Sequence, residues 1–521
     1  MALLLGVDTG GTFTDAVLLR DEVEVVASAK ALTTRHDLAV GIGEAVARVL
    51  AASGVPAGEI GLASLSTTLA TNALVEGQGG RAGLVYIGFR EADVQAHGLA
   101  EALAGDPALV IAGGHGHSGV AAASLDEERL RDWLAAGTGA EAYAVAGLFA
   151  TRNPAHELRA AEIIREMTGK PVSLSHHLSA KLGGPKRAVT ALLNARLVGM
   201  IARLIDRAEG KLSDLGVTAP LMVVRGDGTL ISAAQARERP IETILSGPAA
   251  SIVGARWLTG AEHALVSDIG GTTTDVAVLR GGRPMIDPEG AKVGPWRTMV
   301  EAVAMRTFGL GGDSEVHLAE GLEGGVTLGP RRLMPVSLMA LEARDLVHGV
   351  LEEQGRAAAP SEMDARFVRA VPGIEAGGLS EREAALLARS GGEVRALGAV
   401  LRSRMDHAAL GRLVRRGLVQ VAGVTPSDAS HVLGRVQAWD GEAARLALEV
   451  TARKRVGSGE RLAAGAKALA EMIVARLTHQ TALALLEVGF AEEKEAFGLP
   501  PEVLAGHVLM QKGLGPHRGL V

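Results

Sequence analysis

Two nearly identical stretches decide the fold: Asp8-Thr-Gly-Gly-Thr-Phe-Thr-Asp15 and Asp268-Ile-Gly-Gly-Thr-Thr-Thr-Asp275. Six of their eight positions carry the same residue. Each follows a short apolar run and precedes another, a pattern typical of a strand, a tight turn and a second strand. The copies are separated by about half of the 521-residue chain, so we expect two related lobes, each built around one hairpin.

Around the hairpins, strand-like and helix-like patterns alternate, which predicts an α/β fold. Strands are expected at 24–30, 62–66, 82–87, 142–148, 171–174 and 221–225, and helices at 39–52, 124–135, 156–167 and 187–209. The second of these helices is expected to start at a capping box that begins with Ser124. After Ser337 the chain becomes rich in Ala, Leu, Arg and Glu at helical spacing, and 357–372 is interpreted as a linker. We therefore expect a lobe at 1–180, a second lobe at 181–336 and a mostly helical part at 337–521.

The composition excludes several classes of function. The chain has no cysteine, which excludes thiol catalysis, disulfides and zinc–thiolate sites. Its net charge is -6 and its aromatic content is 2%, so neither nucleic acid nor a membrane surface is an expected partner. The apolar run 1–7 has no basic residue before it, and no apolar stretch reaches the ~18 residues of a membrane span. We expect a cytoplasmic protein.

The repeated hairpin has the residues that phosphate binding needs. Glycine permits positive φ and a close approach of the backbone to a ligand, and successive N–H groups can surround anionic oxygens. Asp8 and Asp268 end the first strands, where a carboxylate can hold Mg²⁺, and Asp15 and Asp275 can orient the hairpin hydroxyls. Two such hairpins suit ATP, because phosphoryl transfer needs positioning and charge neutralisation. The expected phosphate-binding residues are Gly10, Gly11, Thr12, Thr14, Gly270, Gly271, Thr272 and Thr273.

Further motifs give the chain a family resemblance. Thr67-Thr-Leu-Ala-Thr-Asn-Ala-Leu74, Asn153-Pro-Ala-His-Glu157, Leu245-Ser-Gly-Pro-Ala-Ala250 and Thr425-Pro-Ser-Asp-Ala429 accompany the hairpins. Together they resemble the hydantoinase A / 5-oxoprolinase family of actin-like ATPases. The resemblance implies two actin-like lobes with a nucleotide cleft between them.

The resemblance also implies a reaction. Family members open a cyclic amide such as a hydantoin or 5-oxoproline at the expense of ATP, and others serve as ketone carboxylase subunits. They commonly work with a B-type second subunit, so a cyclic amide or ketone substrate, a B-type partner and an oligomer are expected. A small-molecule kinase and an ATPase switch that acts on a protein partner remain alternatives.

The chain departs from the family pattern at several places, including residues 65–66 and 308–314. Leu65-Ser66 stands where members usually have His-Gly. The segment Phe308-Gly-Leu-Gly-Gly-Asp-Ser314 replaces a Gly-Ala-Gly-Gly-Gly-Ser loop. Its Gly309, Gly311 and Gly312 are the expected nucleotide-loop residues.

Three further residues are candidate substrate contacts. Thr71 and Asn72 present hydroxyl and amide groups after a predicted strand, a common location for ligand contacts, although Asn72 fits the N-cap of the next helix equally well. Arg90 follows Gly88-Phe89 and suits a carboxylate or phosphate, or solvent. The run Gly114–Gly119 fits G-x-G-x-x-G, but the acidic helix that follows it does not favour a dinucleotide site.

Overall fold

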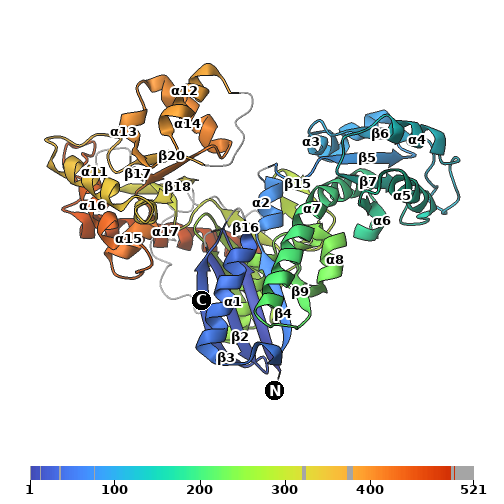
Figure 1. The fold of residues 1–521 in the computed structure, drawn as a ribbon, viewed down its shortest axis with the longest axis horizontal. Helices are drawn as coiled ribbons and strands as arrows, with labels where there is room; N and C mark the ends of the chain where they lie inside the picture. The colour runs from blue at the N-terminus through green and yellow to red at the C-terminus, as the bar shows by residue number, and fades with distance from the viewer. Residues whose placement is uncertain are drawn as a thin grey trace. The chain divides into compact units, whose positions relative to one another are not determined.

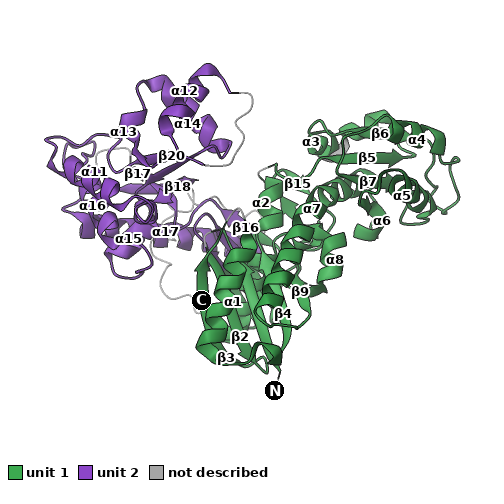
Figure 2. Cartoon of the chain, viewed as in Figure 1, with its two compact units in different colours: residues 1–266, 277–305, 521 green, residues 267–276, 306–520 purple. Residues whose placement is uncertain are grey.

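A computed structural model describes residues 2–11, 13–34, 37–75, 77–319, 324–371, 379–493 and 498 (Figure 1). The chain forms two compact units (Figure 2). Unit 1 contains residues 1–266 and 277–305, and unit 2 contains residues 267–276 and 306–520. The α/β class predicted from the sequence is confirmed.

The main sheet of unit 1 has six strands in the order β10-β9-β4-β1-β2-β3. Its strands are β1 (Leu3–Thr9), β2 (Phe13–Arg20), β3 (Glu24–Leu32), β4 (Ile60–Thr67), β9 (Leu221–Val224) and β10 (Leu230–Ser232). Buried and half-buried residues alternate along β1 and β2, because one face of the sheet is packed more tightly than the other. β1 runs antiparallel to β2 and parallel to β4, so the first hairpin lies at the centre of the sheet.

Helices cover this sheet. α1 (Leu38–Ser53) begins where the Asp37 carboxylate accepts the Ala39 N–H, and it ends at Gly54 with φ of 65°. The other helices of this region are α2 (Leu69–Val75), α8 (Ala233–Glu238) and α9 (Ser246–Thr259). A single apolar core joins the six-stranded sheet, α1 and the long helix α7 (Gly184–Asp214).

A second, four-stranded sheet is inserted between β4 and β9. Its parallel strands follow the order β6-β5-β7-β8 and comprise β5 (Ala82–Ile87), β6 (Ala108–Ile111), β7 (Ala142–Gly147) and β8 (Val172–Leu174). β5 and β7 are buried along their whole length, as expected for a sheet with helices on both faces. One face packs on α4 (Glu127–Ala135) and α5 (Ala155–Thr168), and the other on α3 (Leu99–Leu103) and α7.

The start of α4 predicted from the sequence was wrong. The side chain that caps α4 is that of Asp126, which accepts the Arg129 N–H, and not that of Ser124. The carboxylate is the better cap because it stabilises the positive end of the helix dipole as well as accepting the hydrogen bond.

The longest helix of unit 1 has the composition of a core helix. α7 is the one helix among the described residues that is long and apolar enough to cross a membrane. However, 67% of its most apolar window is buried inside the protein, which makes this weak evidence for a membrane.

The remaining short strands include those of the second hairpin. β11 (Ala264–Ile269) pairs with β12 (Thr274–Arg280), which pairs with β13 (Arg283–Pro284) and β16 (Met305–Phe308). Two further strand pairs are β14 (Lys292–Val293) with β15 (Trp296–Arg297) and β17 (Ser314–Leu318) with β18 (Val326–Arg332).

Unit 2 contains a four-stranded sheet as well as helices. The sheet order is β19-β22-β20-β21, with β19 (Met334–Pro335), β20 (Phe367–Ala370), β21 (Arg395–Ala396) and β22 (Val419–Gly423). The linker or loop expected at 357–372 is therefore wrong for residues 367–370, because Phe367 and Val368 are fully buried in an interior strand, and position 372 lies outside the described residues. The helices of this region are α10 (Val336–Met339), α11 (Arg344–Arg356), α12 (Glu381–Ser390), α13 (Leu397–Val400), α14 (Arg404–Arg415), α15 (Pro426–Val432), α16 (Gly441–Ala452) and α17 (Ala466–Glu493).

Candidate functional site

The two hairpins close with the same hydrogen bond. Gly10 N donates to Phe13 O at 3.0 Å, and Gly270 N donates to Thr273 O at 2.9 Å. The repeat read from the sequence is therefore a repeat of backbone geometry. None of the four turn glycines has φ in the left-handed region, so the expectation of positive φ was wrong.

The first hairpin places Asp8 beside two other elements of unit 1. The Ser66 hydroxyl at the end of β4 donates to the Asp8 carboxylate. A Cβ at Gly247, in the first turn of α9, would lie 3.7 Å from Asp8 Oδ1. Asp8 thus meets the β4 end and the N-terminal end of α9, where partial positive charge favours an anion.

Ser246 holds this junction together. Its fully buried hydroxyl donates to Thr67 O at 3.0 Å and accepts the Thr67 N–H at 3.2 Å. Thr71 adds a third link, because its hydroxyl accepts the Leu245 N–H at 2.9 Å. The Leu-Ser-Gly-Pro and Thr-Thr-x-Ala-Thr motifs, far apart in sequence, therefore form one assembly next to Asp8.

The turn of the first hairpin is open. An added Cβ at Gly11 would have no heavy atom within 4 Å, so packing within the described chain does not explain the glycine. Thr12 lies outside the described residues. Thr14 is fully buried and its hydroxyl lies 3.1 Å from that of Thr33, which in turn donates to Gly10 O. Thr14 thus stabilises the turn through Thr33.

The second hairpin is packed against the glycine loop. Gly312 N donates to Gly270 O at 3.0 Å. A Cβ at Gly311 would lie 2.6 Å from the carbonyl oxygens of both Gly270 and Gly271, so glycine is required there. Gly309 packs on Pro330, where its Cβ would lie 3.3 Å from the proline Cβ.

The carboxylates of the second hairpin influence each other. Asp275 accepts the Thr307 hydroxyl at 2.6 Å and the Thr273 hydroxyl at 3.4 Å. Desolvation raises the pKa of Asp275, and the negative charge of Asp268 raises it further, against the lowering effect of the Thr307 and Thr273 hydrogen bonds. In the first hairpin the corresponding Asp15 is half-exposed and pairs with Lys30 at 3.1 Å.

The other two predicted substrate contacts are Asn72, which follows Thr71 on α2, and Arg90. Asn72 is exposed inside α2 and donates to the Thr68 hydroxyl at 3.3 Å, so the N-cap alternative was wrong. Arg90 is 84% exposed and pairs with Asp93, three residues later, at 2.9 Å. Its carboxylate partner is therefore present within the chain.

The Asn-Pro-Ala-His-Glu motif forms a buried network in the four-stranded sheet. Glu157 is 1% exposed and accepts the Gly147 N–H at 2.7 Å and the Ser175 hydroxyl at 2.5 Å. Its other oxygen contacts the backbone N–H and the ring Nδ1 of His176, at 3.2 and 2.5 Å. The fully satisfied hydrogen bonds give Glu157 a structural role.

In the part of the chain that the structure describes, protein side chains alone do not form a metal site. The described residues contain no group of three or more His, Asp or Glu side chains that could hold a metal ion. Mg²⁺ commonly takes one or two protein carboxylates plus phosphate oxygens and water. Asp8 in unit 1 is a carboxylate of this kind, and Asp268 in unit 2 is another.

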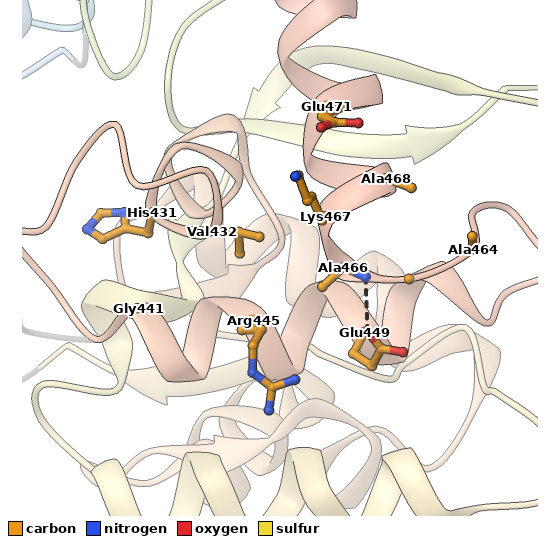
Figure 3. Close-up of a pocket in the computed structure, with 11 residues that line it drawn as sticks. His431, Val432, Gly441, Arg445, Glu449, Ala464, Ala466, Lys467, Ala468 and Glu471 are labelled. Atoms are coloured by element: carbon orange, nitrogen blue, oxygen red, sulfur yellow. Dashed lines mark hydrogen bonds between the residues drawn. The ribbon is translucent and has the colours of Figure 1, made fainter.

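Unit 2 also has an open groove of about 800 Å³ between α15, α16 and α17 (Figure 3). Its polar residues include Arg445, Lys467 and Glu471, and Glu449 caps α17 by accepting the Ala466 N–H at 2.9 Å. His431 contacts Ser427 O and accepts the Trp439 N–H. Glu449 and His431 thus have structural partners.

Sequence reasoning missed Ser66 and Asp313. Ser66 was noted only as a departure from the family pattern, and its hydrogen bond to Asp8 reveals its role. Asp313 was visible as the acidic residue that interrupts a glycine run.

Two family models match the chain. The N-terminal region of hydantoinase/oxoprolinase matches residues 4–168, and the hydantoinase/oxoprolinase domain matches residues 187–496. The chain belongs to the hydantoinase/oxoprolinase family. The family expected from the motifs is thereby confirmed.

Individual relatives are distant. The chain is 28% identical to the caprolactamase alpha subunit of Pseudomonas jessenii, over 63% of this chain and 50% of that protein. It is 30% identical to the acetophenone carboxylase gamma subunit of Aromatoleum aromaticum, over 59% of this chain and 46% of that protein. The chain therefore spans about half the length of these curated relatives.

Solved structures agree on the fold. A nucleotide-free acetone carboxylase chain superposes with a TM-score of 0.56 at 20% identity, covering 98% of this chain and 78% of that one. ATP-dependent caprolactamase from Pseudomonas jessenii gives a TM-score of 0.53 at 25% identity, covering 86% and 63%. Relatives of this chain are thus ATP-dependent enzymes, and several are named as subunits.

Proposed function

We propose that this chain is the ATP-dependent subunit of an enzyme that opens a cyclic amide of the hydantoin, lactam or 5-oxoproline type. The observation that carries the proposal is the pair of equivalent hairpins, each with a carboxylate at its strand end. The similarity to a caprolactamase subunit supports the choice of a cyclic amide.

The proposed reaction has three steps. The amide oxygen attacks the γ-phosphorus of ATP and ADP leaves, which with loss of the N–H proton converts a poor electrophile into an activated imidate phosphate. Water adds to the ring carbon and the ring C–N bond breaks, with protons going to the leaving nitrogen, which gives an acyl phosphate. A second water cleaves the acyl phosphate to the carboxylate and free phosphate. The phosphoryl transfer of the first step needs positioned charge rather than covalent help from the protein.

The hairpin carboxylates and the groups around them have separate roles in this proposal. Asp8, which accepts the Ser66 hydroxyl, would offer a carboxylate to the Mg²⁺ that accompanies a triphosphate, and Asp268 would offer another. The open turn at Gly11 and the N-terminal end of α9 accept phosphate oxygens. Mg²⁺, when bound, neutralises phosphate charge. Thr71, Asn72 and Arg90 stay predictions as substrate contacts.

The test exchanges the two carboxylates for amides. Asp8→Asn and Asp268→Asn should each lower ATP hydrolysis by about 100-fold. Melting temperatures should change little, because asparagine keeps the volume and can still accept a hydrogen bond. Asp15→Asn, in the same hairpin but paired with Lys30, is the control and should keep most of the activity. Wild-type rates in both test variants would refute the site.

A ketone carboxylase subunit is the second candidate, supported by the similarity to the acetophenone carboxylase gamma subunit. In that case the phosphorylated species is an enolate. Phosphate release by the purified chain, screened against lactams, hydantoins and ketones, separates the two. A phosphorylated product without free phosphate would indicate a small-molecule kinase, and stimulation by a protein alone would indicate an ATPase switch.

We further propose that ring opening needs a B-type second subunit in an oligomer, since the relatives are subunits. The isolated chain should show weak or uncoupled ATPase activity. Tightly coupled ring opening by this chain alone would refute the two-subunit idea.

A further inference from the structure

The glycine- and histidine-rich run at 114–119 forms a closed loop after β6. Ala122 N donates to Gly114 O at 3.0 Å, which brings the two ends of the loop together. His115 N donates to Leu148 O at 3.0 Å, which ties the loop to the turn after β7. The proposed ATP chemistry uses none of these residues.

One side chain of α5 holds the base of this loop. Gly114 N donates to His156 Nδ1 at 2.9 Å. A ring nitrogen that accepts a hydrogen bond carries no proton, so His156 is neutral and its single ring proton lies on Nε2. A Cβ at Gly113 would lie 3.3 Å from the same Nδ1, so the loop backbone packs directly on this ring. The hydrogen bond therefore depends on the neutral form of His156.

Three features oppose a positive charge on His156. The centroid of the His115 ring lies 4.4 Å from that of His156, and His115 is 3% exposed. His156 is the second residue of α5, where the positive end of the helix dipole disfavours a cation. Burial lowers the pKa of His156, and burial together with the neighbouring His156 lowers the pKa of His115.

The other charged groups on the elements around the pair do not offset these effects. The Glu157 carboxylate, next on α5, accepts the Gly147 N–H and the Ser175 hydroxyl and contacts His176. Glu127 of α4 pairs with Arg159 of α5 at 2.9 Å. In the part of the chain that the structure describes, these acids therefore have partners other than His156. The remaining groups nearby are Asp126, which caps α4, and Glu128, Arg152 and His117, which are exposed.

We propose that loop 112–122 is a pH-sensitive clasp, closed while His156 is neutral and released from α5 when acid protonates this ring. A protonated Nδ1 is a donor that faces the Gly114 N–H donor, so the hydrogen bond is lost. The clasp is fully stable above about pH 6.5, the ordinary pKa of histidine, and weakens as pH falls below that value.

The clasp borders the turn that carries Arg90. A Cβ at Gly88 would lie 2.6 Å from Gly113 O, so the turn after β5 packs backbone to backbone against the loop. Release of the loop should therefore also loosen the Gly88–Arg90 turn. This inference does not depend on the proposed ATP chemistry.

Hydrogen exchange of the full chain, followed by mass spectrometry at about pH 7.5 and about pH 5, tests the clasp. After correction for intrinsic exchange rates, segment 112–122 should lose protection by about fivefold or more at the lower pH, the effect of one lost hydrogen bond. β5 and β7 should keep their protection. Equal protection of the loop at both pH values overturns the inference, and so does an equal loss across the whole sheet.

Three variants assign the effect to one ring. His156→Asn places an amide oxygen near the position of Nδ1 and cannot titrate, so its loop should stay protected at both pH values. His156→Ala removes the acceptor and should leave the loop less protected at both. His117→Asn is the matched control, because His117 lies in the same loop but is exposed, and it should keep the wild-type pH dependence. A wild-type pH dependence in His156→Asn, or its loss in His117→Asn, overturns the inference.

Discussion

Replacing Glu157 by glutamine tests whether the buried network of the four-stranded sheet is structural. Both carboxylate oxygens of Glu157 accept two donors each, at 2.5 to 3.2 Å. An amide nitrogen in place of either oxygen faces two donors and accepts neither. Two hydrogen bonds to a charged acceptor are lost, each with about 1.5–3 kcal/mol, so we expect a loss of roughly 3–6 kcal/mol.

The neighbouring guanidinium increases the effect. Arg187 is 1% exposed, and it donates to Gly147 O at 2.8 Å and to the Ser175 hydroxyl at 3.2 Å. Glu157 provides negative charge near it. The variant leaves this buried positive charge without compensation, which is costly in a medium of low dielectric constant.

Amide hydrogen exchange measures the loss locally. The Gly147 N–H donates directly to Glu157, so its protection should fall by at least about 100-fold, with each decade worth 1.36 kcal/mol. Glu162→Gln on the same helix is the control, because Glu162 is 63% exposed and contributes little. Unchanged Gly147 exchange and melting temperature in Glu157→Gln would refute the reasoning.

Three further perturbations have defined outcomes. Gly311→Ala should lower the melting temperature of unit 2, because the new Cβ would lie 2.6 Å from two backbone oxygens. Gly11→Ala should leave the melting temperature unchanged, and equal shifts in the two variants would contradict this reasoning. The pKa of Asp275 is raised in the folded protein, so ionising this carboxyl group lowers the free energy of unfolding: its favourable contribution is complete below about pH 4 and is lost as pH rises. The free energy of unfolding of Asp275→Asn, relative to that of wild type, should therefore increase between pH 4 and pH 7 in urea titrations, and a difference that does not change with pH would refute the assignment. Ser246→Ala should cost about 1–3 kcal/mol, because the buried N–H and C=O of Thr67 lose their partner, and a loss below 0.5 kcal/mol by denaturant titration would contradict that role.

Much of unit 1 was predictable because its signals are local. The alternation of buried and half-buried residues in β1 and β2 follows from period-two hydrophobicity. The two ends of α1 are marked in the sequence by Asp37 at the N-cap and Gly54 at the C-cap. β20 was missed because four residues, Phe367–Ala370, near prolines give a weak strand signal. Their partners β21 and β22 determine the structure.

The candidate site was predictable in its residue types but not in its contacts. Asp8 and Asp268 end their strands as the hairpin pattern requires. The hydroxyl that orients Asp8 comes from β4, and the carboxylate beside Gly271 comes from a loop about 40 residues further along the chain. Such neighbours depend on tertiary packing, which periodicity and turn residues do not encode.

α7 has a mechanical consequence for unit 1. It has 31 residues and is therefore about 46 Å long, and its only proline lies in its first turn. Part of the helix packs on β5 and β7, and part packs on α1. A straight helix of this length couples the two sheets, so a change in the tilt of one sheet of unit 1 should be accompanied by a change in the tilt of the other.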